Sequence, residues 1–288
     1  MITADLGSGS GFPHRARQAR FHPPETEILM VARASRVVRV SALVAGTLIA
    51  GATLTGCGTA DVDDATPESR SFTIGGRELV VDSDNSRIEL VPAAGEGKEI
   101  KVTRWFDGWT IGGSAGTTWE MQEDGKTLRL RMKCDGISAD CEAKHRIEVP
   151  RGVTVTVDDT NGSVSARGFE TGMKVTSTNG AIDVRGAKGP LELRSTNGGI
   201  DVRDAASRSV SASSTNGGVR VGLSTVPETV TTRTTNGAIR IDLPRASYKV
   251  DADSRNGGVT VDVPRDPAAR PAVAARSNNG AIDVRSTG

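Results

Sequence analysis

The chain has 288 residues, which is enough for one or two domains with a sizeable core. Lys and Arg number 36 against 35 Asp and Glu, so no basic surface of the kind that binds nucleic acid or anionic membranes stands out. Aromatic residues make up only 3% of the chain and Gly is frequent, a mixture typical of short β-strands joined by tight turns. A narrow, layered core is therefore expected, and the three Cys and three His limit metal and nucleophile chemistry.

The first part of the chain looks like an export signal with an extension in front of it. Residues 1–29 lack apolar periodicity and are rich in Gly, Pro and Arg, so we predict that they are disordered or that translation begins at Met30. From Met30 onward, three Arg precede the uncharged stretch 40–54, as in a secretory signal peptide. This stretch is shorter than the roughly 20 residues that a transmembrane helix needs.

The signal ends in Leu54-Thr55-Gly56-Cys57, which resembles the bacterial lipobox. The resemblance implies that residues 30–57 are a lipoprotein signal peptide and that Cys57 carries the lipid as the first residue of the mature protein. The expected location is the outer face of the bacterial cytoplasmic membrane or the cell surface, because two or more acyl chains anchor a protein firmly. Residues 58–70 are polar and acidic, so we predict a flexible linker there.

Residues 71–288 form the predicted repeat domain, in which the dipeptide Asn-Gly recurs. Subtracting successive Asn positions gives spacings of 18, 18, 19, 20, 20 and 23 residues, the mark of one module stacked on its copies. The seven index residues are Asn161, Asn179, Asn197, Asn216, Asn236, Asn256 and Asn279. The positions six and four before each Asn, and three and five after it, are almost wholly apolar, whereas those between are mostly polar. This period of two predicts two short strands per unit.

The same frame finds an eighth, disguised unit around Asn85. Leu79 and Val81 lie before this Asn and Ile88 and Leu90 after it, so all four apolar columns are filled although Ser replaces Gly. The long interval between Asn85 and Asn161 is then an insertion at about residues 91–150, with strands expected near 99–103, 126–132 and 145–149.

Two architectures fit the repeat. Asn-Gly between alternating apolar residues is a strong hairpin signal, so a β-sandwich or meander of hairpins is the alternative. Tandem repetition favours a stack with like residues about 4.8 Å apart, in which Asn side chains form an amide ladder and Gly provides a corner with positive φ. One unit alone cannot offset the entropy of ordering it. We therefore predict an all-β, right-handed β-solenoid of stacked 18–20-residue rungs, with the Asn residues as its structural ladder.

The insertion holds the most distinctive side chains. Trp105, Phe106, Trp109 and Trp119 form either a ligand-contact surface or the small core of the insertion, and the sequence favours neither.

Cys134 and Cys141 are predicted to form a disulfide, because an exported protein meets oxidising conditions. Closing this eight-residue loop stabilises by about 2.5 kcal/mol in the chain-entropy model. The alternative, a metal site with His145, lacks a fourth ligand, so no metal and no cofactor are expected. His145 begins a strand, and we interpret it as a surface or edge histidine rather than a general base.

Charged residues recur four and six positions after several Asn and predict a solvated face of ion pairs. An ionic glycan or cation site on this face is the alternative. These residues are Asp183, Asp201 and Asp283 with Arg185, Arg203 and Arg285.

The run Ser177-Thr178-Asn179-Gly180-Ala181-Ile182-Asp183-Val184 and its copies, with residues 149–153 leading into them, resemble the bacterial putative-adhesin family of β-strand-repeat proteins, a domain of unknown function. The resemblance covers roughly residues 72–285. It implies an exported, often membrane-attached protein, and the family has no established catalytic residues.

These features together predict a non-catalytic cell-envelope lipoprotein, a surface-binding, adhesin-like or scaffold module. The expected partners are the membrane, through the lipid on Cys57, and a cell-wall polymer or another envelope protein, but no nucleic acid. The alternatives are a polysaccharide-active β-helix enzyme, which would need clustered acids and bases in a groove, and an envelope-stress accessory protein.

Overall fold

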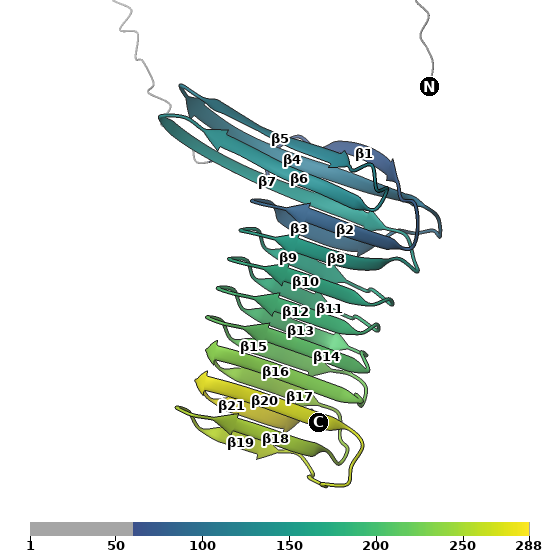
Figure 1. Cartoon of the computed structure of the whole chain (residues 1–288), viewed down its shortest axis with the longest axis vertical. Helices are drawn as coiled ribbons and strands as arrows, with labels where there is room; N and C mark the ends of the chain where they lie inside the picture. The colour runs from purple at the N-terminus through teal and green to yellow at the C-terminus, as the bar shows by residue number, and fades with distance from the viewer. Residues whose placement is uncertain (1–59, 288) are drawn as a thin grey trace, which may run out of the picture. The chain divides into compact units, whose positions relative to one another are not determined.

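The computed structural model describes residues 60–287, which lie within one compact unit, Thr55–Gly288. Every regular element in this range is a β-strand (Figure 1), and no helix there is long and apolar enough to cross a membrane. The predicted N-terminal extension, the signal peptide and Cys57 lie outside the described residues.

The strands are β1 (Glu68–Thr73), β2 (Glu78–Ser83), β3 (Arg87–Pro92), β4 (Glu99–Ile111), β5 (Ser114–Met121), β6 (Thr127–Asp135), β7 (Ser138–Val149), β8 (Thr154–Asp159), β9 (Val164–Arg167), β10 (Met173–Ser177), β11 (Ile182–Arg185), β12 (Leu191–Ser195), β13 (Ile200–Ala205), β14 (Ser209–Ser214), β15 (Val219–Leu223), β16 (Thr229–Asn236), β17 (Ile239–Leu243), β18 (Lys249–Ser254), β19 (Val259–Asp262), β20 (Ala272–Asn279) and β21 (Ile282–Ser286).

These strands form two sheets, to each of which every repeat contributes one strand. The eleven-stranded sheet has the order β1-β4-β7-β3-β9-β11-β13-β15-β17-β21-β19, and the ten-stranded sheet has the order β18-β20-β16-β14-β12-β10-β8-β2-β6-β5. Neighbouring repeats pair in parallel and in register, with Ile182 opposite Ile200 and Val175 opposite Leu193. The two strands of a hairpin would instead pair antiparallel with each other. The predicted β-solenoid of stacked rungs is therefore confirmed.

The core is a layer of apolar side chains between the two sheets. Val175, Leu193, Val184 and Val202 are each at most 1% exposed. They occupy the predicted apolar columns, which lie on one face of each strand because side chains alternate along it. Residues with small or β-branched side chains suit the narrow space between the sheets, which explains the low aromatic content.

An asparagine ladder runs along one edge of the stack. Each Asn side-chain amide donates a hydrogen bond to the side-chain oxygen of the Asn in the adjacent rung, over 2.6–2.9 Å. The ladder begins at Asn85, which accepts from Asn161, and β2 pairs with β8 in the predicted register. The disguised eighth rung is therefore present.

The glycine of each Asn-Gly pair has a different role from the one expected. These glycines are not in the positive-φ region. They are required because the backbone of the adjacent rung leaves no space for a side chain: a Cβ at Gly180 would lie 1.6 Å from the carbonyl oxygen of Gly162, and one at Gly198 would lie 1.9 Å from that of Gly180. The expected positive-φ corner was wrong, and close stacking is the physical reason for Gly.

The last two rungs do not stack in chain order. After β16–β17 the chain forms the outermost rung, β18–β19, and then returns to insert β20–β21 between them. Figure 1 shows β18 and β19 beyond β20 and β21. Val259 of the outermost rung is consequently 41% exposed, whereas Ile282, at the equivalent position of the inserted rung, is 1% exposed.

The insertion extends both sheets at the other end of the stack, and we name residues 99–149 the long-stranded unit. β4 pairs antiparallel with β1 and β7, and β5 pairs antiparallel with β6. β7 and β6 then join the first rung through parallel pairs with β3 and β2. These long strands project past the rungs on one side (Figure 1).

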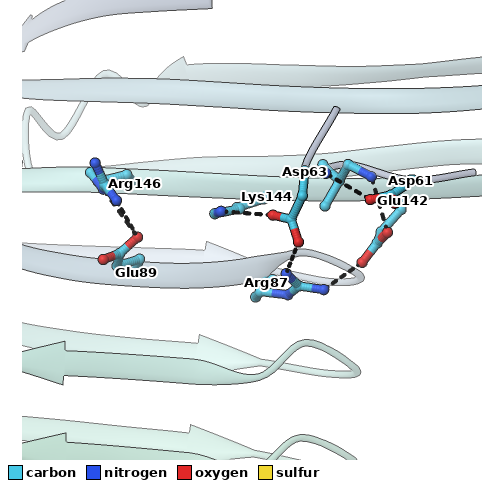
Figure 2. A network of polar contacts seen from close by, with 8 residues as sticks. Asp61, Asp63, Arg87, Glu89, Glu142, Lys144 and Arg146 are labelled. Atoms are coloured by element: carbon cyan, nitrogen blue, oxygen red, sulfur yellow. Dashed lines mark hydrogen bonds and ion pairs between the residues drawn. The ribbon is translucent and has the colours of Figure 1, made fainter. Parts of the chain in front are cut away.

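The predicted flexible linker is wrong for residues 60–70, which lie on the long-stranded unit. Successive backbone N–H groups of residues 60–62 donate to the carboxylates of Asp140, Asp107 and Glu142, and the Val62 side chain is fully buried. Asp63 then forms ion pairs with Lys144 and Arg87 (Figure 2). An acidic composition suggested a solvated tether, but one valine and complementary charges hold this segment in place, and β1 follows it.

Candidate functional site

The four aromatic residues of the insertion do not form one surface. Trp119 on β5 is only 4% exposed and packs edge-on against Phe72, with 6.3 Å between ring centroids. The guanidinium carbons of Arg70 and Arg104 each lie 4.8 Å from the centre of its ring. Such cation–π contacts stabilise the ring where it is. Trp119 is therefore part of the core of the long-stranded unit and not a contact residue.

The other three aromatic residues lie along β4 and are half-buried. Side chains alternate along a strand, so Trp105 and Trp109 share one face and Phe106 lies on the other. Lys144 and Arg146 approach the ring of Trp105, at 5.1 and 5.7 Å from its centre. Only Trp105 and Trp109 could therefore act together at a surface.

The cysteines and His145 are placed so that they cannot form the alternative metal site. Cys134 on β6 and Cys141 on β7 are joined in a disulfide, as the sequence predicts. Within residues 60–287, no three His, Cys, Asp or Glu side chains gather as a metal ion would require.

The interpretation of His145 as a surface histidine was wrong. Its side chain is fully buried, next to Trp119, and neither ring nitrogen has a hydrogen-bond partner among the described residues. Burial, with a smaller contribution from the charge of Arg104, lowers the pKa of His145 from 6.5 to about 4. An imidazole enclosed in this way stays neutral at physiological pH and has no access to a substrate.

A second buried titratable group lies inside the stack itself. Asp159 is 6% exposed and stands in a column otherwise made of hydroxyl residues, between Ser83 and Ser177. Its Oδ2 accepts a hydrogen bond from the N–H of Gly162 over 2.6 Å. Burial raises the pKa of Asp159 from 3.8 to about 6, although this hydrogen bond and the nearby hydroxyls lower it.

A groove with a volume of about 660 Å³ crosses five rungs of the eleven-stranded sheet. It runs along the stack, so at about 4.8 Å per rung it is about 20 Å long. Small residues two positions after each index Asn form its floor. They are Ala181, Gly199, Gly218, Ala238 and Ala281. The sequence analysis missed this groove, although the repetition of Ala or Gly at one position was the available signal.

Charged side chains four positions after each Asn line one side of the groove. In spatial order they are Asp183, Asp201, Arg220, Arg240 and Asp283. Arg220 pairs with Asp201 at 3.4 Å and Arg240 with Asp283 at 3.5 Å. The second pair exists only because the last rung is inserted next to β17.

These ion pairs neutralise most of the charge along this side of the groove. Arg203, beside the groove, also contacts Asp201 at 2.5 Å and Asp183 at 3.4 Å, and its hydrogen bond to Asp201 raises the pKa of the guanidinium further. The result is a long, shallow groove with a small-residue floor and an edge that carries both signs of charge, two Arg between three Asp. This shape suits an extended chain with several polar groups better than a compact small molecule.

Fold and surface together define a β-solenoid repeat protein with a long surface groove. Residues 132–285 match the Toastrack DUF4097 family, and the chain belongs to this family. The match confirms the resemblance to a strand-repeat domain of unknown function. No functionally curated protein matches the chain.

Three solved structures are similar to this chain. They are a putative cell adhesion protein from Clostridium sporogenes (12% identity, 77% of this chain and 100% of that one, TM-score 0.35), a putative adhesin from Bacteroides fragilis (10%, 77% and 97%, 0.46) and a putative adhesin from Parabacteroides merdae (12%, 78% and 98%, 0.42).

Proposed function

We propose that this protein is a non-catalytic, lipid-anchored binding module of the bacterial cell envelope, and that its groove holds an extended polymer of the cell wall. The groove itself is the observation that supports this function. It crosses five rungs, presents both signs of charge along one side and has a floor of exposed small residues, such as Ala181 and Gly199. A polymer with regularly spaced polar groups can contact successive rungs in the same way.

The remaining features agree with an extracytoplasmic binding role. The lipobox-like sequence at Cys57 suggests an anchor, and the disulfide between Cys134 and Cys141 suits an oxidising compartment. His145 is enclosed in the core, so a hydrolase or lyase using it as a base is disfavoured.

The groove is tested by filling it. Ala238 is exposed at the groove floor, so Ala238→Trp adds bulk there without entering the core. We expect this variant to bind isolated cell-wall polymer at least tenfold more weakly than the unaltered chain. Ala268→Trp is the matched control, because Ala268 is exposed in the loop before β20, away from the groove.

Two outcomes would contradict the proposal. If the unaltered chain co-sediments with none of the purified cell-wall polymers, the groove has another role. If new chain ends appear in the polymer during incubation, the protein is an enzyme. The anchor is tested separately by Cys57→Ser, which should move the protein from the membrane fraction of cells to the soluble fraction.

A further inference from the structure

The two most exposed large apolar side chains of the described residues lie side by side at one place. Ile137 is 89% exposed and Ile111 is 56% exposed. Ile111 ends β4 and Ile137 lies in the turn between β6 and β7, and the N–H of Ile137 donates to the carbonyl oxygen of Ile111 over 2.8 Å. We name this part of the long-stranded unit, residues 109–115 and 134–140, the tip.

The tip is built to hold these side chains in a fixed position. The two turns approach so closely that a Cβ at Gly113 would lie 1.9 Å from the carbonyl oxygen of Asp135, and one at Gly136 would lie 2.2 Å from Oγ1 of Thr110. The hydroxyl of Thr110 also donates to the Asp135 carbonyl oxygen over 2.7 Å. The disulfide links β6 and β7 next to this point. Apolar side chains that are exposed next to one another are a feature of surfaces that contact another molecule or a membrane.

The chain enters the unit at the same tip. The N–H of Ala60 donates to Oδ2 of Asp140, which lies on β7 three positions after Ile137. Two residues lie between Cys57 and Ala60, and a fully extended chain covers these three residue steps in about 10 Å. A lipid on Cys57 would therefore hold the tip next to the membrane.

We propose that the tip rests on the lipid surface in which Cys57 is anchored, with Ile111 and Ile137 entering the interfacial layer. This inference rests on the lipid anchor of the proposed function. Trp109 lies two residues before Ile111 and on the same face of β4, and tryptophan is a residue type that favours membrane interfaces.

Two further features specify the kind of lipid surface. Asp135 and Asp140 flank Ile137, so the tip fits a zwitterionic surface better than an anionic one. Two isoleucines alone bind a bilayer weakly. A neighbouring anchor makes this contact intramolecular, and a weak contact then becomes sufficient.

The test attaches the domain to vesicles chemically. A chain of residues 57–288, which contains the whole described unit, has Cys57 as its one thiol outside the disulfide, so it can be coupled to a maleimide phospholipid in phosphatidylcholine vesicles. Ile137→Trp then reports contact through quenching by acyl-brominated phosphatidylcholine. Val226→Trp is the matched control, because Val226 is 44% exposed in the turn between β15 and β16.

After subtraction of the emission of the unaltered chain, we expect at least threefold stronger quenching at position 137 than at position 226. Quenching should fall when anionic phosphatidylglycerol is added at low salt. Equal quenching at the two positions would overturn the inference. A second measurement uses the chain without an added tryptophan. There, the double substitution Ile111→Ser with Ile137→Ser should reduce quenching of the native tryptophan emission. No reduction would also count against the inference.

The failure of the anchor and the failure of the tip contact can be told apart. Chemical coupling at Cys57 does not depend on lipidation in the cell. If Cys57→Ser leaves the cellular protein in the membrane fraction, the anchor of the proposed function fails, and the tip inference for this protein falls with it. If the anchor is present and position 137 is not quenched, only the tip inference fails.

Discussion

The stacked rungs and the long-stranded unit bury their cores in different ways. In the rungs, the same four columns of small apolar residues repeat, so each rung is covered by near-copies of itself, as with Ile182 against Ile200. In the long-stranded unit, bulky residues that differ from their neighbours in the adjacent strand fill the space, notably Trp119 and the buried His145, which lies opposite Ile88. Repetition spreads the stability of the rungs over many equivalent contacts. The stability of the long-stranded unit, and the dependence of that stability on pH, rest on a few side chains.

The largest expected effect tests how closely the rungs must stack. Gly198→Ala places a Cβ 1.9 Å from the carbonyl oxygen of Gly180, and backbone cannot move aside easily in the middle of a stack. We expect the free energy of unfolding to fall by at least about 3 kcal/mol, measured by urea denaturation.

The neighbouring glycine provides the matched control for this substitution. A Cβ at Gly199 would lie 3.5 Å from the nearest atom, and Ala occupies the equivalent position 181. Gly199→Ala should change stability by no more than about 0.5 kcal/mol. Similar losses for both variants would show that Gly serves the conformation of the turn and not close stacking.

The rungs could be predicted from the sequence because register is encoded twice, in the period of two and in the repeat. Asn85 was found in this way although its unit lacks Gly. The order of the last two rungs could not be predicted, since the units of Asn256 and Asn279 have equivalent columns and either fits against β17. The sequence sign that the chain turns back here was the longer interval between Asn256 and Asn279, in which residues 263–271 contain three prolines.

The site was less predictable because it depends on neighbours that the sequence does not place together. Arg240 lies next to Asp283 only after the final rung is inserted. For His145, the signal was present and misinterpreted: Ile147 and Val149 share its face of β7 and are buried, so alternation indicated a buried histidine. The segment 60–63 was taken as a linker because one buried valine does not change an acidic composition.

The long-stranded unit should lose stability in acid because of His145. Its pKa is about 4 in the folded protein against 6.5 without burial. Between these values the unfolded chain binds a proton that the native chain does not, so stability falls as the pH drops from 6.5 to 4. The loss is about 3 kcal/mol.

His145→Ile should remove this loss, because isoleucine has no group that titrates. Isoleucine should also fit the space, since Ile88 and Val164 occupy the same column. At pH 7 the variant should be more stable by about 1 kcal/mol, because two unpartnered ring nitrogens are replaced by an apolar group. Urea denaturation from pH 4 to pH 7 measures both effects. If unaltered protein and variant show the same pH dependence, His145 is not the responsible group.

Asp159 gives the rungs a pH dependence of the opposite sign. Its pKa is raised to about 6, so above this pH the native chain holds a buried carboxylate, and stability falls as the pH rises from about 4 to 6. Asp159→Ser should stabilise the protein at pH 7 by up to about 2 kcal/mol, allowing for solvent screening. The equivalent Ser177 accepts the same hydrogen bond, from Gly180 over 2.8 Å.

The gain from Asp159→Ser should fade below pH 4, where the carboxyl is neutral in both states. Asp158→Ser is the control, because Asp158 is the exposed neighbour on the same strand. An equal gain at pH 4 and pH 7 would mean that packing, and not the buried charge, distinguishes Ser from Asp at this position.

The smallest expected effect concerns the asparagine ladder. Asn197 donates to Asn179 over 2.7 Å and accepts from Asn216 over 2.8 Å. Asn256, in the outermost rung, donates to Asn279, and no Asn of the described residues donates to it. These side chains are exposed, so water replaces a lost partner and each bond contributes modestly. Asn197→Ala should therefore lower the free energy of unfolding by about 1 kcal/mol and Asn256→Ala by about half as much. If the terminal substitution lowers stability as much as the central one, each Asn stabilises the conformation of its own turn and not the contact between rungs. Repetition would then matter for the apolar columns alone.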